Sequence, residues 1–313
     1  MVISEQQLQT WSSAPSPTEM QKIQNTRGVI EDILKRKLPV EEIKRTHGLS
    51  HFGYEVYLQG SYANSTNIRF DSDVDIAVQL NGVFYSDKSQ LSDGEKLLHE
   101  FAYSDSKYRF RQFKDDVFAA LTAELGTGQA HWNDKCIDID GNTYRSEADV
   151  VPCIQYKLYK RFISYDNQSF VEGMKFFDTS NDKEIINFPK LHLKNCESKN
   201  IDASGKFKDL VRIYKNMRNN LVDHNLLGED VAPSYFIENM LYNCSSPCFD
   251  GNYGDCMLKS LQFIFDAIQT GRISGFICAN EQDTLISQKT WNIENLVLFL
   301  AKIADYYLGK ITI

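Results

Sequence analysis

The sequence predicts an α/β (α+β) protein in which a sheet in the first part of the chain is followed by helices. Strand-like apolar runs occur within Phe70–Val78 and again within Lys135–Ile154. From about residue 200, apolar residues recur at the three- and four-residue spacing of helices. The 313 residues are 42% apolar and 24% charged, which is ordinary for a globular chain of one or two domains.

A long helix is predicted to begin at Pro17. Ser16 suits the N-cap, Pro17 suits the first helical position, and Glu19 completes a capping box. The apolar residues that follow near helical spacing are Met20, Ile23, Ile30 and Leu34.

Two aspartates on one predicted strand follow a Gly-Ser turn. Gly60 has no side chain to keep backbone amides away from a triphosphate, and Ser61 adds a hydroxyl donor. Asp73 and Asp75 stand at positions i and i+2, so their side chains share one face of the strand, about 7 Å apart at Cα. Carboxylates at this spacing suit a pair of magnesium ions, and a third carboxylate is then required from elsewhere.

A β-hairpin that turns at Gly141-Asn142 is predicted to supply the third carboxylate. Asp149 lies on its second arm, before the apolar strand end Val150–Pro152, where an aspartate is out of place. The alternative is that Asp73, Asp75 and Asp149 are ordinary surface carboxylates among 42 acidic residues. Their order and their strand context favour a shared metal site.

Helices are predicted in two places after the first strands. A polar helical stretch at about Leu91–Gly126 interrupts the sheet, and a later helix carries an apolar face beside a cationic stripe. The stripe consists of Lys208, Arg212 and Lys215 at i, i+4 and i+7. On a generic helix, such a stripe is a solvated face.

We expect three parts in the chain. Residues 1–45 form an N-terminal segment with the long helix. Residues 46–195 form a lobe that contains the sheet, and residues 196–313 form a helical C-terminal lobe.

These motifs resemble those of the DNA polymerase β-like nucleotidyltransferases. More narrowly, they resemble the cGAS/DncV-like nucleotidyltransferases, which bacteria use in anti-phage signalling (CBASS). The residues that carry the resemblance are Gly60–Tyr62, Thr66, Ile68-Arg69, Ser72–Asp75, Ala148–Pro152, Asn187–His192, Asn195, Lys199-Asn200, Phe207–Lys215 and Pro233–Glu238. Ala148–Pro152 and Asn187–Lys190 are most similar to the CdnE branch, several members of which accept pyrimidine nucleotides. The resemblance implies a catalytic lobe with a mixed sheet, a helical C-terminal lobe, and the N-terminal helix as a spine that joins them.

The resemblance also implies an enzyme that joins nucleoside triphosphates into a cyclic dinucleotide or cyclic oligonucleotide second messenger and releases pyrophosphate. Asp73 and Asp75 would hold two magnesium ions, for which manganese is an alternative. Asp149 would bind the catalytic ion and help deprotonate the ribose hydroxyl, while Gly60 and Ser61 hold the donor phosphates. Catalysis would then be mostly positioning and charge neutralisation.

The resemblance implies that three residues of the helical lobe hold the nucleotide. Lys215 matches a family lysine that reaches the phosphates. Ser234 and Tyr235 match a pair in which the serine contacts phosphate and the tyrosine stacks on a base. Stacking contributes about 1–3 kcal/mol per base and depends little on the identity of the base.

Base choice therefore requires hydrogen bonds to a base edge, and an asparagine offers both a donor and an acceptor. Asn187 is the first candidate for this role and Asn195 the second, whereas His192 is expected to be structural. The CdnE-like segment at Asn187 predicts that UTP is accepted. The expected substrates are UTP and ATP, with CTP and GTP as further candidates.

The net charge of −8 bears on the partners and on the rival functions. Duplex binding requires a basic face, so we expect no obligatory nucleic acid. A linear polymerase of the oligoadenylate or RNA-tailing type is the alternative enzyme, but it would need a basic groove for its growing strand. A binding protein without activity is the second rival, but such proteins usually lose one of the three aspartates.

The chain is expected to be cytoplasmic and monomeric, with a product that is read by a separate effector protein and no membrane contact. Met1–Leu8 lacks the features of a signal peptide. Seven cysteines without a repeated spacing suit a reducing compartment. Cys244, Cys248 and Cys256 match no common zinc motif, so no zinc is expected.

Overall fold

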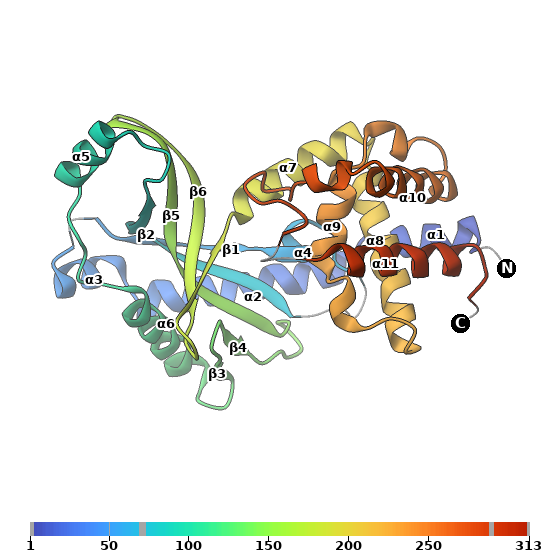
Figure 1. Cartoon of the computed structure of the whole chain (residues 1–313). Coiled ribbons are helices and arrows are strands. Elements are labelled where there is room, and N and C mark those ends of the chain that lie inside the picture. Colours follow the sequence, from blue (N-terminus) through green and yellow to red (C-terminus); the bar gives the residue numbers. More distant parts are fainter. Residues whose placement is uncertain (1–2, 50, 69–72, 288–290, 312–313) are drawn as a thin grey trace. The chain divides into compact units, whose positions relative to one another are not determined.

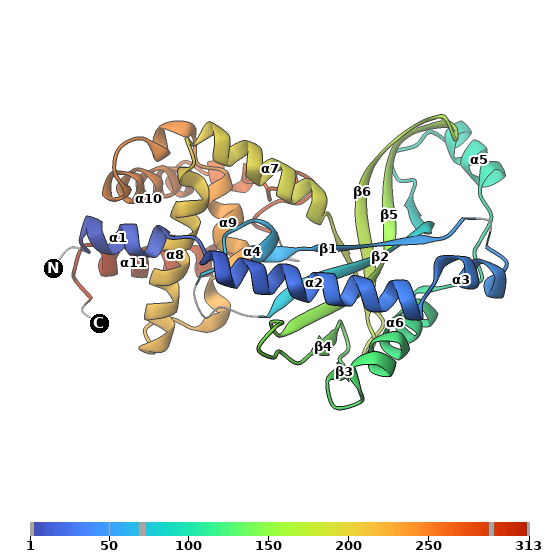
Figure 2. The ribbon, with the colours of Figure 1, turned by 180° about the vertical axis from the view of Figure 1, so that it is seen from behind.

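The computed structural model describes residues 3–49, 51–68, 73–287 and 291–311 (Figures 1 and 2). Its contacts divide the chain into two units. The sheet unit comprises Pro17–Gln59 and Ser72–Lys190, and the helical unit comprises Met1–Ser16, Gly60–Asp71 and Leu191–Ile313. This division does not follow sequence order, because the long N-terminal helix groups with the sheet while residues 60–71 group with the C-terminal helices.

The described part of the sheet unit holds a sheet of seven strands, and it is mixed, as the family resemblance implies. The strands run in the order β1-β2-β5-β4-β3, and β6 pairs with both β5 and β7. β2 and β5 are parallel, and the other pairs are antiparallel. The strands are β1 Gly53–Leu58, β2 Val74–Asp87, β3 Ala130–Trp132, β4 Ile137–Ile139, β5 Ala148–Ser164, β6 Asn167–Asp178 and β7 Lys183–Asn187.

Helix α2 (Pro17–Lys37) begins at Pro17, as predicted, and lies along the sheet of its own unit (Figure 2). It buries Ile23, Ile30 and Leu34 among its apolar residues and packs against β1 and α6. The other helices of this unit are α3 Val40–His47, α5 Asp93–Ala102 and α6 Phe110–Leu125.

The predicted helical stretch at 91–126 is two helices rather than one. Tyr103 and Arg109 have extended backbones, with φ of −123° and −122°, and the residues between them are not helical. The polar run Ser104–Ser106 explains the break, because serine and aspartate side chains compete with helical backbone hydrogen bonds. Helix α5 packs against the long strand β5 (Figure 1).

The helical unit is organised around α8 (Lys206–Asp223). Its predicted apolar face is fully buried and packs with the other helices into one core. The six residues of this face are Phe207, Leu210, Val211, Tyr214, Met217 and Leu221. The helices around it are α1 Glu5–Ser12, α4 Gly60–Ala63, α7 Pro189–Asp202, α9 Ser234–Tyr242, α10 Tyr253–Gln269 and α11 Ile293–Tyr307, with short 3-10 turns at Glu229–Val231, Ser246–Phe249 and Arg272–Gly275. The first two residues of α7 belong to the sheet unit.

The cationic stripe of α8 is not a solvated face. Arg212 and Lys215 are only 4% and 1% exposed, while Lys208 is half-buried. Their charged groups are used inside the helical unit, since Arg212 pairs with Asp209 and donates to the carbonyl of Ser12. Sequence spacing alone could not predict the burial of these two cations. Helix α8 packs against several other helices, so residues on most of its circumference are buried. Among the helices described, none combines the length and the apolarity needed to span a membrane.

Candidate active site

Two neighbouring parallel strands bring the three predicted metal ligands together in the sheet unit. Asp73 is exposed and immediately precedes β2, and Asp75 and Asp149 are the second residues of β2 and β5. Asp75 stands opposite Asp149 in the register of this pair. Strand alternation explains the arrangement, because Val74 and Ile76 are buried on the opposite face.

A fourth carboxylate, Asp138 on β4, was missed by the sequence reasoning. The predicted hairpin is present, but its turn is centred later than Gly141-Asn142, with the amide of Asn142 bonded to the carbonyl of Arg145 at 2.8 Å. This register places Asp138 opposite Asp149. The sequence does show Asp138 as a polar residue between Ile137 and Ile139, which could have marked it as a candidate ligand. Only the correct turn length, however, pairs it with Asp149.

Burial and the repulsion of neighbouring carboxylates disfavour the ionisation of Asp75 and Asp149. Burial raises the pKa of Asp75 to about 7, with further contributions from the negative charges of Asp149 and Asp73. Burial also raises the pKa of Asp149 to about 6, together with the nearby Asp138 and Asp73. Like charges in a partly buried cluster are unfavourable unless a cation neutralises them.

The donor atoms of the cluster fit a hard divalent cation. Ligand atoms of Cys136, Asp138 and Asp149 all lie within 4.8 Å of one another. Burial raises the pKa of the Cys136 thiol, which donates to Asp138 at 3.0 Å and remains protonated. The carboxylate oxygens are therefore the metal ligands that this cluster offers, and oxygen is the donor that magnesium prefers.

The predicted phosphate turn lies in the helical unit. Gly60 has a φ of +65°, a left-handed conformation that favours glycine, and it opens the single turn of α4. Gly60 is exposed and Ser61 is half-buried. Arg69 and Ser72, which contribute to the family resemblance, lie outside the described residues.

Charged side chains of α8 and α9 hold the chain just after this turn. Lys215 donates to the carbonyl of Thr66 at 3.0 Å, and Arg212 donates to the carbonyl of Ser65. The buried carboxylate of Glu238 accepts from the Asn64 amide at 2.5 Å and from the Thr66 hydroxyl at 3.1 Å. The structure thus gives Lys215 a positioning contact that the sequence did not indicate.

Ser234 and Tyr235 are the first two residues of α9. The hydroxyl of Ser234 accepts from Arg218 at 3.0 Å. Tyr235 is 42% exposed, and its ring stacks on His192 with the centroids 5.0 Å apart. His192 is itself buried and hydrogen-bonded to Glu238 at 3.1 Å, so it supports the Tyr235 ring as a structural residue.

The two candidate base readers differ in exposure and in their contacts. Asn187 is exposed at the end of β7, and within the described residues no hydrogen bond engages its side-chain amide. Asn195 is half-buried on α7, and its amide donates to the carbonyl of Ala279 at 2.7 Å. Asn187 lies in the sheet unit and Asn195 in the helical unit.

Aspartates at i and i+2 where a strand begins, with a third on the parallel neighbour, are the arrangement expected of a metal-dependent nucleotidyltransferase. Residues 30–118 match the family described as nucleotidyltransferase domain. Residues 194–308 match the family described as cGAS/DncV-like nucleotidyltransferase C-terminal helical domain.

Individual relatives are similar along nearly the whole chain. A cyclic UMP-AMP synthase of Rhodothermus marinus is 35% identical, with 99% of each chain covered. A cyclic dipurine nucleotide synthase of Elizabethkingia meningoseptica is also 35% identical, with 85% of each chain covered. The solved structure of the Rhodothermus marinus CdnE c-UMP-AMP synthase with Apcpp and Upnpp matches with a TM-score of 0.82 and 34% identity, over 98% of this chain and 97% of that one. The chain therefore belongs to the cGAS/DncV-like nucleotidyltransferases of the CdnE type, and it is a nucleotidyltransferase.

Proposed function

We propose that the aspartate cluster of the sheet unit is the catalytic centre of a cyclic dinucleotide synthase. The chain converts nucleoside triphosphates into a cyclic dinucleotide, or a larger cyclic oligonucleotide, and releases pyrophosphate. Its relatives are named as synthases of cyclic dinucleotides, which supports the proposal. The assignment of the catalytic centre to these residues rests on the strand register, which places Asp75 opposite Asp149. Asp73 lies near enough for its charge to raise the pKa of Asp75. Magnesium dependence and a role in anti-phage signalling are general to the family.

Asp73, Asp75 and Asp149 would hold two magnesium ions, with manganese as a substitute. Bound magnesium would neutralise triphosphate charge and make the attacking hydroxyl more acidic. The raised pKa values of Asp75 and Asp149 support this assignment, because they report a charge excess that a divalent cation relieves. Asp138 would support the orientation of Asp149 from the neighbouring strand.

The reaction would run twice in one enzyme. A ribose hydroxyl of the acceptor attacks the α-phosphorus of the donor, Asp149 accepts the hydroxyl proton, and pyrophosphate leaves. The linear dinucleotide then turns over, and its free hydroxyl closes the ring with loss of a second pyrophosphate. Gly60 and Ser61 would hold the donor phosphates, Lys215 and Ser234 would bind phosphate, and Tyr235 would stack on a base.

UTP and ATP are the substrates that we propose, with CTP and GTP as alternatives. Two relatives of equal identity are named for different bases, so overall similarity does not choose between them. Asn187 supports a pyrimidine, because its exposed amide is available for a base edge. Asn195 is the second choice, since its side-chain amide already donates a hydrogen bond to the carbonyl of Ala279.

The proposal includes a monomeric enzyme without an obligatory nucleic acid, and a separate effector protein that reads the product. It also includes a cytoplasmic location, which the seven buried, unpaired cysteines favour.

A product assay tests the proposed function. The purified chain is incubated with the four ribonucleoside triphosphates and magnesium, and the products are identified by mass before and after phosphatase treatment. A cyclic product has no terminal phosphate and keeps its mass under phosphatase. Products that lose phosphate would instead indicate a linear polymerase.

A further inference from the structure

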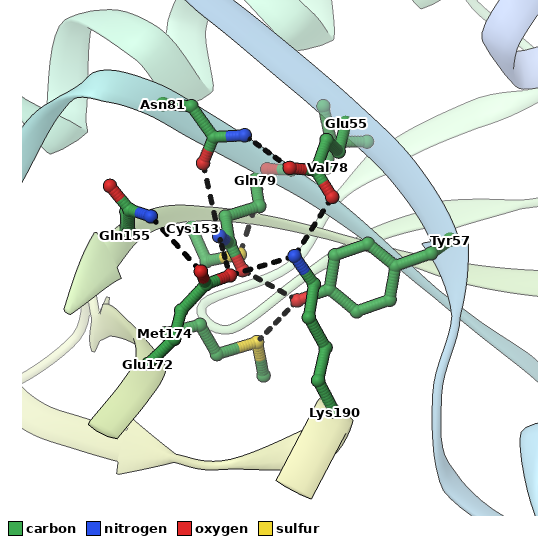
Figure 3. Close-up of polar contacts among 10 residues, drawn as sticks. All are labelled: Glu55, Tyr57, Val78, Gln79, Asn81, Cys153, Gln155, Glu172, Met174 and Lys190. Atoms are coloured by element: carbon green, nitrogen blue, oxygen red, sulfur yellow. Dashed lines mark hydrogen bonds and ion pairs between the residues drawn. The ribbon is translucent and has the colours of Figure 1, made fainter. Parts of the chain in front are cut away.

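Polar side chains gather on one face of the sheet unit, on four neighbouring strands (Figure 3). Alternate residues of each strand share this face, and the register brings them side by side. The strand residues of the cluster are Glu55 and Tyr57 of β1, Gln79 and Asn81 of β2, Cys153 and Gln155 of β5, and Glu172 and Met174 of β6. None of them belongs to the aspartate cluster.

Lys190, in the first turn of α7, binds this face. Its ammonium lies 2.7 Å from Glu172 and 2.8 Å from Glu55, and 5.2 Å from the centre of the Tyr57 ring (Figure 3). The hydrogen bonds close into a ring, because Gln79 donates to Glu172 at 3.2 Å and to Asn81 at 3.0 Å. Asn81 completes it with a donation to Glu55 at 2.6 Å.

Glu172 is the residue on which most of these contacts converge. Besides Lys190 and Gln79, its carboxylate accepts from Gln155 at 3.2 Å. Burial raises the pKa of Glu172, but the hydrogen bond and charge of Lys190 with the two amides together lower it below the ordinary value. Glu172 is therefore ionised at neutral pH, and it presents Lys190 with a fixed anionic partner.

The segment just before Lys190 is fixed to the same strand by packing. Asn187 pairs with Met174 in the β6–β7 register. At Gly173, an added Cβ would lie 2.8 Å from the Asn187 carbonyl oxygen and 2.9 Å from the Phe188 ring, so this approach requires glycine. Phe188 is 7% exposed and packs edge-on against Tyr156.

The segment Asn187–Lys190 is thus held by strand pairing at Asn187, by packing of Phe188 and by the ion pairs of Lys190. Lys190 and Glu55 are both partly exposed, with side-chain exposures of 40% and 51%. Ion pairs with this exposure add little to stability, whereas a closed set of hydrogen bonds fixes geometry. The arrangement therefore suits a positioning role more than a stabilising one.

We propose that Glu172 and Lys190 are positioning residues that set the place of Asn187 and thereby contribute to the choice of base. This inference rests on the proposed function, in which the segment faces a nucleobase. If the side-chain amide of Asn187 is displaced by a fraction of an ångström, it loses part of its hydrogen bond to the preferred base, while the stacking and phosphate contacts of the nucleotide are retained.

The test compares the base composition of the product formed from equimolar UTP, ATP, CTP and GTP. Glu172→Gln and Lys190→Met should each lower the share of the preferred base relative to its competitors by about three- to tenfold, which is part of the effect of a lost hydrogen bond. Lys190→Arg should keep the wild-type composition, because it retains the charge. The matched control is Glu184→Gln. It breaks the 2.7 Å ion pair between Glu184 of β7 and Lys175 of β6, the strands that carry Asn187 and Glu172, but it leaves the contacts of Lys190 intact.

Thermal unfolding and the KM and kcat for each triphosphate are measured on the same proteins. A changed composition with little change in Tm supports positioning. Wild-type composition in both Glu172→Gln and Lys190→Met, or an equal loss of all products with a lowered Tm, overturns it. Asn187→Ser tests the reader itself. If it leaves the composition unchanged while Glu172→Gln alters it, Asn187 is not the residue through which Glu172 and Lys190 act, and this proposal fails while the proposed synthase activity stands.

Discussion

At the scale of single residues, Asn187 and Asn195 show how a contact decides between two similar candidates. The Asn195 amide already donates to Ala279, whereas the Asn187 amide is exposed at the end of β7. A residue that reads a base must have unused donors and acceptors before the substrate binds. We therefore propose Asn187, rather than Asn195, as the residue that chooses the base.

Replacing Asn187 by serine should shift substrate preference from UTP towards ATP. Serine has a shorter reach and leaves room for a purine, and a lost hydrogen bond in a closed site costs about 1–3 kcal/mol, or roughly ten- to a hundredfold in preference. The measurement is the ratio of uridine to adenosine incorporated under direct competition. An unchanged ratio would move the assignment to Asn195, for which Asn195→Ser is the corresponding variant.

At the scale of elements, α8 holds the Gly60 turn through buried charges. Lys215→Met should lower stability by about 1–3 kcal/mol, because it leaves the carbonyl of Thr66 without its 3.0 Å donor in a buried place. Thermal unfolding measures this loss. Lys208→Met on the same helix is the matched control, since Lys208 is only half-buried.

Kinetics of the same variant separate two roles of Lys215. If the lysine only holds the turn, kcat/KM should recover at low temperature, where the protein is fully folded. A KM for triphosphate that stays raised in the folded protein would indicate the phosphate contact that the family resemblance implies. An unchanged Tm together with an unchanged KM would contradict both roles.

The sequence predicted the elements better than their contacts. The start of α2 at Pro17 and the buried face of α8 follow from local signals of capping and spacing, whereas the mixed sheet was implied by the family resemblance. The pairing of Asp138 with Asp149 depends on the length of a turn, and Gly141-Asn142 indicated a different register. One shift of register changes which side chains meet, so local signals could not find Asp138.

The burial of Arg212 and Lys215 could not be predicted either, for a different reason. Their spacing is that of an exposed stripe, but the carbonyls that they bind belong to Ser65 and Thr66, far away in the sequence. Glu238 is a similar case, because its four hydrogen-bonding partners come from two distant segments. Such networks are properties of tertiary structure.

At the scale of the whole molecule, the aspartate cluster should make folding stability depend on pH and magnesium. The pKa values of Asp75 and Asp149 rise from 3.8 to about 7 and about 6, so the folded state binds more protons than the unfolded state between about pH 4 and 7. Stability of the metal-free protein should therefore fall as pH rises through this window, by on the order of 1–2 kcal/mol after solvent screening.

Magnesium should reverse this loss, because in the proposed site it would bind the ionised carboxylates of the folded state. Thermal unfolding at pH 5.5 and pH 8, with and without magnesium, measures both effects. In Asp75→Asn the pH dependence should be smaller and the magnesium effect weaker. Equal pH dependence in the variant and in the wild-type protein would show that other groups cause it.

The most direct test of the central claim is product formation by the variant in which Asp73→Asn and Asp75→Asn are combined. Each substitution removes an anionic oxygen that magnesium requires, while the strand register and the core side of β2 are left unchanged. Circular dichroism and thermal unfolding establish that the variant is folded. We predict that the wild-type chain forms a phosphatase-resistant cyclic product with magnesium and that the folded variant forms none. Near wild-type turnover in the folded variant would contradict the assignment of the catalytic centre.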